Sequence, residues 1–247
     1  MRLERAPEQR FSDRAAAYVR GRPGYPASLL EVLRERCDLK PSSVVADVGA
    51  GTGILSRLLR ESGCDVRAVE PNAAMREAAG LPMIAGTAEA TTLPDASIDL
   101  VTAAQAFHWF DRARARVEFA RILKPGGWVA VIWNDRRLST PFGAEYERFI
   151  RAFGTDYAGV AARDVMNRTD LEAFLGKDYF EASLDNPQVL DREGFRYRVL
   201  SASYMPAPGH PKHADMLEAM EALFLHYQEE GWVVMDQDTR LYAGRLG

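Results

Sequence analysis

The feature that most constrains the fold of this chain is an apolar run that contains Asp47 and leads directly into three glycines at alternating positions, Gly49, Gly51 and Gly53. A second apolar run ends on an acidic residue, Glu70, 23 positions after Asp47. An apolar run, a helix and a second apolar run that closes on a carboxylate form the first half of a nucleoside-binding βαβ unit. We therefore expect a nucleoside cofactor at the turn after the first strand.

The spacing of the glycines indicates which cofactor this is. A dinucleotide fingerprint, G-x-G-x-x-G, would place its third glycine at position 54, where this chain has Ile54. The chain instead has an acid, Asp47, two residues before the first glycine. This pattern resembles the first motif of class I methyltransferases that use S-adenosylmethionine.

The residue types suit such a site for physical reasons. Glycines bring the backbone close to a ligand because they have no Cβ. The Glu70 carboxylate can accept both ribose hydroxyl protons, and Asp47 can accept the methionyl amino group, directly or through water. Taken singly, the glycines are equally compatible with a structural loop, and Glu70 with a solvated strand end or, together with Asn72, a helix start. The combination at this spacing favours the cofactor site.

Strand and helix patterns alternate through the first half of the chain. The expected strands are residues 43–48, 66–70, 82–85, 97–103 and 128–133, and the expected helices are residues 26–37, 53–62, 72–79 and 111–123. A turn with one proline and two glycines, residues 124–127, separates the last helix from the last strand. This alternation predicts an α/β fold with a doubly wound parallel sheet, whose ligands bind at the carboxyl ends of the strands.

The pattern loosens after residue 133. We expect helices at 141–153, 169–175, 191–201 and 213–229, and strands at 179–186 and 232–245. By the resemblance, the last strand is antiparallel and closes a mostly parallel, seven-stranded, Rossmann-like methyltransferase sheet. The whole chain, residues 1–247, is then one domain with a helical lid over the substrate, formed by about 1–36, 140–175 and 190–230.

The bulk composition excludes several classes of protein. With 247 residues, 47% of them hydrophobic and 27% charged, the chain has ordinary globular composition. A net charge of −4 and the absence of a long basic block argue against a nucleic-acid partner. No apolar run reaches the roughly 18 residues of a membrane span. We therefore expect no membrane partner. Two cysteines are too few for a disulfide framework, so we expect a reduced, cytoplasmic protein.

Further stretches resemble the small-molecule branch of these methyltransferases, a broad group that includes trans-aconitate methyltransferase-like enzymes. The resemblance covers nearly the whole chain and rests on residues 11–18 with 22–26, 86–89 with 93–99, 104–111, 123–127 and 201–206.

The resemblance implies where the adenine base lies. Residues 86–89 would form its edge, with Thr87 at the position where the family usually has aspartate, and with Ala88 beside it. A threonine hydroxyl can still accept a hydrogen bond from the adenine amino group, more weakly than a carboxylate. Pro71 and Met75 would contact the ring, although Met75 is equally compatible with an ordinary helix core.

The segment after the fourth expected strand carries the candidate for chemistry. Gln105 would lie beside the methionyl chain and the reactive methyl group. His108 is the candidate general base, because an imidazole suits deprotonation of a hydroxyl or amine nucleophile. Its aromatic neighbours, which include Phe107 and Trp109, are also typical of a packed histidine that orients the loop. If the acceptor is already a carboxylate, no base is needed.

The acceptor itself is expected near the N-terminal segment. Tyr18, Arg22, Tyr25 and Trp109 are the candidate substrate-binding residues, and Arg22 could pair with a substrate carboxylate or remain an exposed charge. We expect no metal, since the histidines near residue 210 have no cysteine or carboxylate partners at ligand spacing.

These observations and the resemblance predict an S-adenosylmethionine-dependent methyltransferase that acts on a small-molecule acceptor and releases S-adenosylhomocysteine. The methylated atom is expected to be an oxygen, which can belong to a carboxylate, or a nitrogen. The alternatives are a non-catalytic S-adenosylmethionine-binding regulator on the same fold and, disfavoured by Ile54, a nicotinamide-dependent oxidoreductase.

Overall fold

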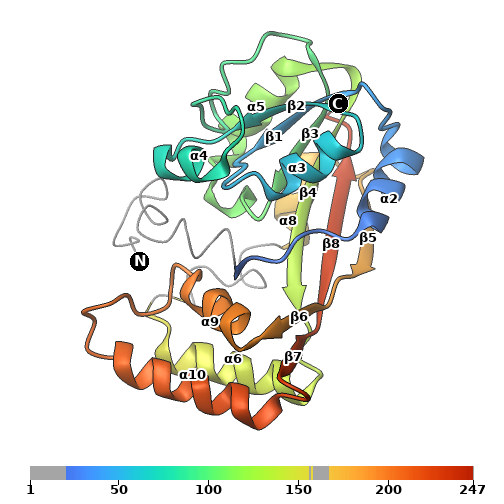
Figure 1. Ribbon diagram of the computed structural model, residues 1–247. Coiled ribbons are helices and arrows are strands. Elements are labelled where there is room, and N and C mark those ends of the chain that lie inside the picture. The colour runs from blue at the N-terminus through green and yellow to red at the C-terminus, as the bar shows by residue number, and fades with distance from the viewer. Residues whose placement is uncertain (1–20, 156, 158–166, 247) are drawn as a thin grey trace.

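A six-stranded sheet forms the centre of the computed structural model, which describes residues 21–155, 157 and 167–246 (Figure 1). The strand order is β2-β1-β3-β4-β8-β5. The strands are β1 (Val44–Val48), β2 (Asp65–Val69), β3 (Ile98–Ala104), β4 (Leu123–Arg136), β5 (Phe180–Asp185) and β8 (Gln237–Gly244).

The first four strands of the sheet are parallel, and β8 runs antiparallel to both β4 and β5. Strands β1 and β3 are almost continuously apolar because helices cover both faces of this part of the sheet. The carboxyl ends of β1, β2 and β3 therefore meet at one edge, which is where ligands bind in such sheets.

Helices pack on the two faces of the sheet. On one face lie α2 (Ala27–Cys37) and α3 (Ile54–Glu61), whose leucines share a hydrophobic cluster with the strands. On the other face lie α5 (Arg112–Ile122) and α8 (Arg168–Leu175). The short helix α4 (Ala73–Ala79) follows β2. Although the lid was expected to include α2 and α8, these helices contribute to the core of the sheet instead.

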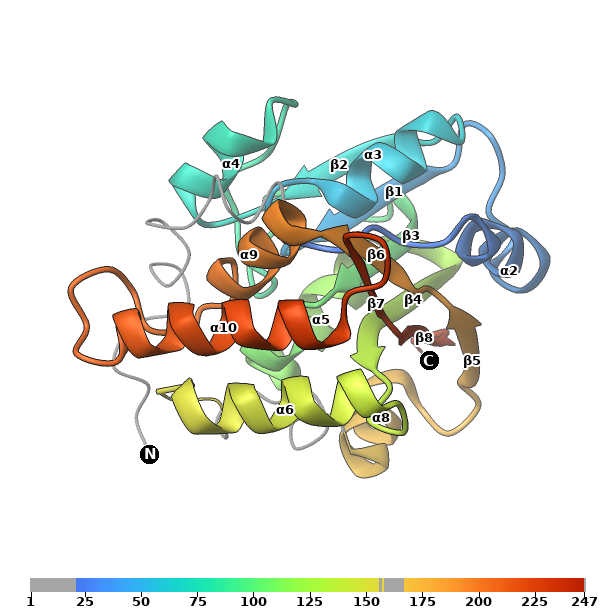
Figure 2. The same cartoon turned by 60° about the horizontal axis from the view of Figure 1, so that its bottom comes forward.

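A second hydrophobic core lies beyond the carboxyl ends of the strands and forms a unit that we call the cap. It consists of α6 (Pro141–Phe153), α9 (Arg192–Leu200), α10 (His213–Tyr227) and a two-stranded ribbon of β6 (Gln188–Asp191) and β7 (Trp232–Met235) (Figure 2). The largest side chains buried there are aromatic, Tyr146 and Phe195 among them. The cap thus covers the edge of the sheet where a ligand site is expected.

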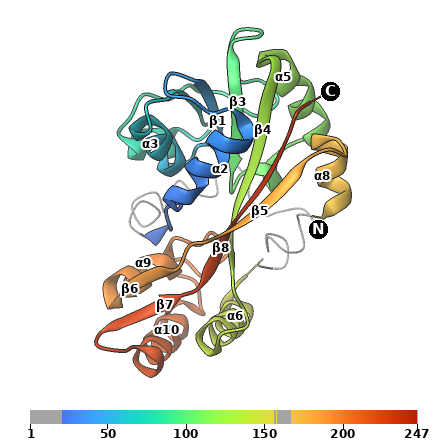
Figure 3. The same cartoon turned by 90° about the vertical axis from the view of Figure 1, so that its right-hand side faces the viewer.

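Three details differ from the sequence-based expectations. The described sheet has six strands rather than seven, since the expected strand at 82–85 makes only one bridge, between Ile84 and Val69. The expected strand at 232–245 is two strands, β7 and β8, which pair in different sheets (Figure 3). The turn at 124–127 is a bulge in β4, because Leu123 and Trp128 pair with residues only two apart on β3.

None of the helices in the described part of the chain combines the length and the hydropathy that crossing a membrane requires.

Candidate cofactor-binding site

The turn after β1 has a backbone conformation that favours glycine. Gly49, Gly51 and Gly53 all have positive φ angles, of 71°, 58° and 77°. A Cβ on Gly49 would lie 2.5 Å from the Cβ of Ala106. The Gly49 amide donates to the Val69 carbonyl oxygen at 2.9 Å, which holds the turn against the end of β2. The glycine spacing is therefore a requirement of the local backbone.

Glu70 follows β2 directly and is 7% exposed. Its Oε1 accepts a hydrogen bond from the Asn72 amide at 2.9 Å, and its Oε2 accepts one from the Gly51 amide at 2.8 Å. Burial raises the pKa of this carboxyl, against the lowering effect of the two amides. Each carboxylate oxygen has two lone pairs, so two acceptor positions remain for a ligand.

Asp47 is almost completely buried, at 1% exposure, and is bound within the protein. Its Oδ2 accepts from the Ser56 hydroxyl at 2.5 Å and its Oδ1 accepts from the Thr102 hydroxyl at 3.0 Å. Burial raises its pKa, although both hydroxyl bonds favour the charged form. This carboxylate ties α3 and β3 to β1, and its contact with a methionyl amino group stays a prediction.

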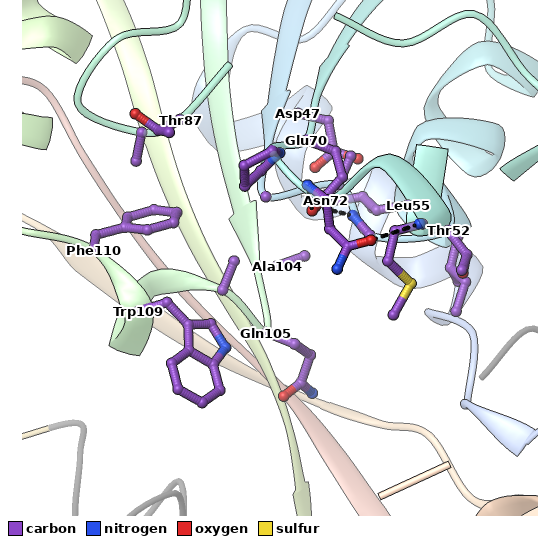
Figure 4. Close-up of a pocket in the computed structure, with 18 of the residues that line it drawn as sticks. Asp47, Thr52, Leu55, Glu70, Asn72, Thr87, Ala104, Gln105, Trp109 and Phe110 are labelled. Atoms are coloured by element: carbon purple, nitrogen blue, oxygen red, sulfur yellow. Dashed lines mark hydrogen bonds between the residues drawn. The ribbon is translucent and has the colours of Figure 1, made fainter. Parts of the chain in front are cut away.

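A pocket lies at the carboxyl ends of β1, β2 and β3. It brings together eleven of the residues predicted to form the site: Tyr25, Asp47, Gly49, Gly51, Glu70, Pro71, Met75, Thr87, Ala88, Gln105 and Trp109. Figure 4 shows Glu70 on one side of the pocket and Thr87 and Trp109 on the other, with Gln105 at its lower end. The roles assigned to these residues toward a ligand stay predictions.

Sequence reasoning missed nine residues that line the pocket: Ala50, Thr52, Ile54, Leu55, Asn72, Glu89, Ala104, Ala106 and Phe110. Two of them carried a signal. The Asn72 side chain caps α4 by accepting from the Met75 amide at 3.0 Å, as an asparagine before a helix suggests. Phe110 ends the aromatic run around His108, and its ring faces the pocket in Figure 4.

Four predicted site residues do not line this pocket. Gly53, Arg22 and His108 are not among the residues that line it, and Tyr18 lies outside the described residues. The centroid of the His108 ring is 4.2 Å from that of Trp109 and 4.9 Å from that of Trp133. His108, in the short helix η3 (Phe107–Trp109), therefore contacts two indole rings. Its assignment as a general base stays a prediction.

The loop that carries Thr87 is held in place from behind by a buried carboxylate on α5. The Glu118 Oε1 accepts from the amide of Thr91 at 2.8 Å and from its hydroxyl at 2.5 Å. Arg121 donates to both oxygens of the same carboxylate. These bonds lower the pKa of Glu118 to about 2. The wall of the pocket thus depends on an ionised group outside it.

A nucleoside group fits this pocket by the chemistry of its lining. The acid at the end of β2 offers acceptors to ribose hydroxyls, the glycine turn permits close approach, and Met75 and Phe110 supply apolar surface. Together with a sheet of four parallel strands and an antiparallel β8, these features fit the Rossmann-like methyltransferase fold that the sequence predicts.

Comparisons with known proteins agree with this class. Residues 46–131 match the family model described as a methyltransferase domain. An uncharacterised methyltransferase of Mycobacterium tuberculosis is 44% identical over 131 residues, which are 51% of this chain and 52% of that protein. One from Schizosaccharomyces pombe is 34% identical over 138 residues, 53% and 55% of the two chains. The matches span about half of the length of these relatives.

Solved structures extend the likeness to the whole fold. A candidate type II methyltransferase from Anaeromyxobacter dehalogenans is 25% identical with a TM-score of 0.62, covering 91% of this chain and 98% of that one. A structure from Anabaena variabilis, described as a methyltransferase from an antibiotic biosynthesis pathway, is 20% identical with a TM-score of 0.61, covering 92% and 99%. The cap is therefore included in the shared architecture.

Proposed function

We propose that this protein is an S-adenosylmethionine-dependent methyltransferase that methylates an oxygen or nitrogen atom of a small molecule. The observation that carries the proposal is the Glu70 carboxylate, which faces a pocket lined by the glycine turn and keeps two acceptor positions after binding two backbone amides. Its position after β2, in a methyltransferase domain, supports ribose recognition.

The other lining residues suit the remaining parts of the cofactor. Pro71 and Met75 would contact the adenine ring, with Thr87 and Ala88 along its edge. Gln105 would lie beside the methionyl chain. Its side-chain nitrogen lies 3.4 Å from the Asn134 carbonyl oxygen, which orients the amide between β3 and β4.

S-adenosylmethionine, when bound, would supply a methyl group on a positively charged sulfur, which would keep the electron pair of the C–S bond when the methyl group is transferred to the acceptor. The protein's task is then mainly alignment and exclusion of water. Trp109 and Tyr25 also line the pocket. The His108 ring contacts that of Trp109, and for a hydroxyl or amine acceptor we propose that His108 receives the proton.

Isothermal titration of the protein with S-adenosylmethionine, S-adenosylhomocysteine and NAD tests the cofactor assignment. We expect both adenosyl compounds to bind and NAD not to bind. Binding of NAD with no response to either adenosyl compound would overturn the proposal. A matching measurement of S-adenosylhomocysteine release, with a panel of small hydroxyl, amine and carboxylate compounds, tests whether binding leads to turnover.

A further inference from the structure

One side chain of the cap is charged and buried, and two of its donor atoms have no hydrogen-bond partner among the described residues. Arg198 lies on the inner face of α9 and is 5% exposed. Within the part of the chain that the structure describes, its Nε and Nη1 have no acceptor. A guanidinium keeps its charge and carries five N–H donors, and burying such a group without partners costs free energy. A buried guanidinium with free donors is suited to binding an anion.

Two further arginines approach Arg198 from other elements. Arg22, in the segment before α2, donates from Nη2 to the Ser201 carbonyl oxygen at 3.2 Å. Arg136, at the end of β4, donates from Nη2 to Glu147 at 3.0 Å. We call Arg22, Arg136 and Arg198 the arginine cluster.

Arg22 and Arg136 both act electrostatically on Arg198. Apart from burial, which lowers the pKa of Arg198, the groups that act on this pKa are Tyr146, Arg22, Tyr204 and Arg136. None of these four is a carboxylate. The Glu147 carboxylate beside Arg136 also binds Arg151, at 2.9 Å, so its charge is already shared between two cations. Among the described residues, Arg198 itself has no hydrogen-bonded carboxylate, and an anion bound to its guanidinium would offset its charge.

The cluster adjoins the cofactor pocket. The segment that carries Arg22 lies directly on α9, since a Cβ on Gly21 would be 2.3 Å from the Tyr197 carbonyl oxygen. Tyr25, three residues after Arg22, lines the pocket, and three residues span at most about 11 Å. Figure 1 shows α9 beneath this segment, between the sheet and the rest of the cap. The backbone positions of Arg22 and of the pocket-lining Tyr25 are therefore at most about 11 Å apart.

We propose that Arg198, flanked by Arg22 and Arg136, binds a carboxylate of the methyl acceptor, which is then a small organic acid. The inference rests on the proposed function of the adjoining pocket. A guanidinium matches a carboxylate with two parallel hydrogen bonds, which gives orientation as well as attraction. Because arginines stabilise the anion, the carboxylate that they hold is a weak nucleophile. It positions the acceptor, and a different oxygen or nitrogen atom of the same molecule attacks the methyl carbon.

The test uses the protein saturated with S-adenosylhomocysteine and titrated with aliphatic dicarboxylates from malonate to adipate, each compared with its uncharged diamide. We expect at least one dicarboxylate to bind at least tenfold more tightly than its diamide, and Arg198→Gln to remove that preference while S-adenosylhomocysteine affinity stays unchanged. Arg192→Gln is the matched control, because Arg192 lies on the same helix but pairs with Glu221 at the surface.

Three results would overturn the inference: no dicarboxylate preferred over its diamide, equal binding by the Arg198→Gln and Arg192→Gln variants, or tighter binding of inorganic phosphate than of every dicarboxylate. If Arg198→Gln does not fold, Arg198→Lys keeps the charge without the planar fork, and unchanged dicarboxylate binding by this variant would count equally against the inference. Failure of the proposed function is a separate result, namely that S-adenosylhomocysteine does not bind the wild-type protein.

Discussion

Replacing Glu70 with glutamine tests the cofactor site most directly, because it changes charge and acceptor capacity while keeping size. In the wild type, each carboxylate oxygen binds one backbone amide and has one position left for the ligand. A glutamine keeps one of the two oxygens and places an NH₂ donor opposite the other amide. Both the charge and one of the two ligand positions are therefore lost.

The expected loss of cofactor affinity follows from the number of acceptor positions that Glu70→Gln removes. Hydrogen bonds to a charged group contribute about 1.5–3 kcal/mol, which corresponds to roughly 10- to 150-fold in affinity. We expect Glu70→Gln to weaken S-adenosylhomocysteine binding within this range in isothermal titration. Wild-type affinity should also decrease as the pH falls through the raised pKa of Glu70, because the protonated carboxyl loses acceptor capacity. The variant should show a flatter pH dependence.

Glu77→Gln is the matched control, since Glu77 lies on α4 seven residues later and is exposed. Circular dichroism and urea unfolding would establish that both variants are folded. If Glu70→Gln binds S-adenosylhomocysteine as tightly as the control does, Glu70 does not bind the ribose and the reasoning is wrong.

Three further predictions concern stability and can be measured by urea or thermal unfolding. Gly49→Ala should destabilise the protein by about 2–4 kcal/mol through the contact with Ala106 and the positive φ, and an unchanged midpoint would contradict this. Glu118 has a folded pKa of about 2, below its unfolded value, so its ionised form adds stability above about pH 4.5 that is lost as the pH falls toward 2. The difference between wild type and Glu118→Gln should therefore be about 2–3 kcal/mol near neutral pH and shrink in acid; a pH-independent difference would refute the assignment. Arg198→Leu should stabilise the ligand-free protein by about 1–4 kcal/mol, since it removes a buried charge without a hydrogen-bond partner in the described chain, whereas a lower midpoint would mean that Arg198 supports the fold.

Local patterns were sufficient to predict the first half of the site. Strands β1 and β2 lie within one residue of the expected ranges, and Glu70 follows β2 as the apolar run suggested. Local patterns failed to predict strands whose extent depends on which other strand they pair with. Ile84 has one bridge partner because glycines and a proline restrict the expected strand around it. The C-terminal strand divides at Asp236 because its two halves pair with different sheets.

Contacts between distant parts of the chain could not be predicted from the residue pattern alone. His108 was a candidate base because of its chemistry, but its ring contacts Trp133, which belongs to another strand. Arg198 was not singled out, because nothing in its local sequence indicates that it is buried near Arg22. The sequence gives the chemistry of each side chain, but the residues that surround that side chain depend on the tertiary structure.

The short connections between the sheet and the cap determine how these two parts can move. Two residues join β5 to β6 and only Asp236 joins β7 to β8, and the two junctions lie on neighbouring strands, tied by a bond from the Asn186 amide to the Gln237 carbonyl oxygen at 3.0 Å. Because the two junctions are bonded to each other, a movement of the cap relative to the sheet would have to involve both strands at once.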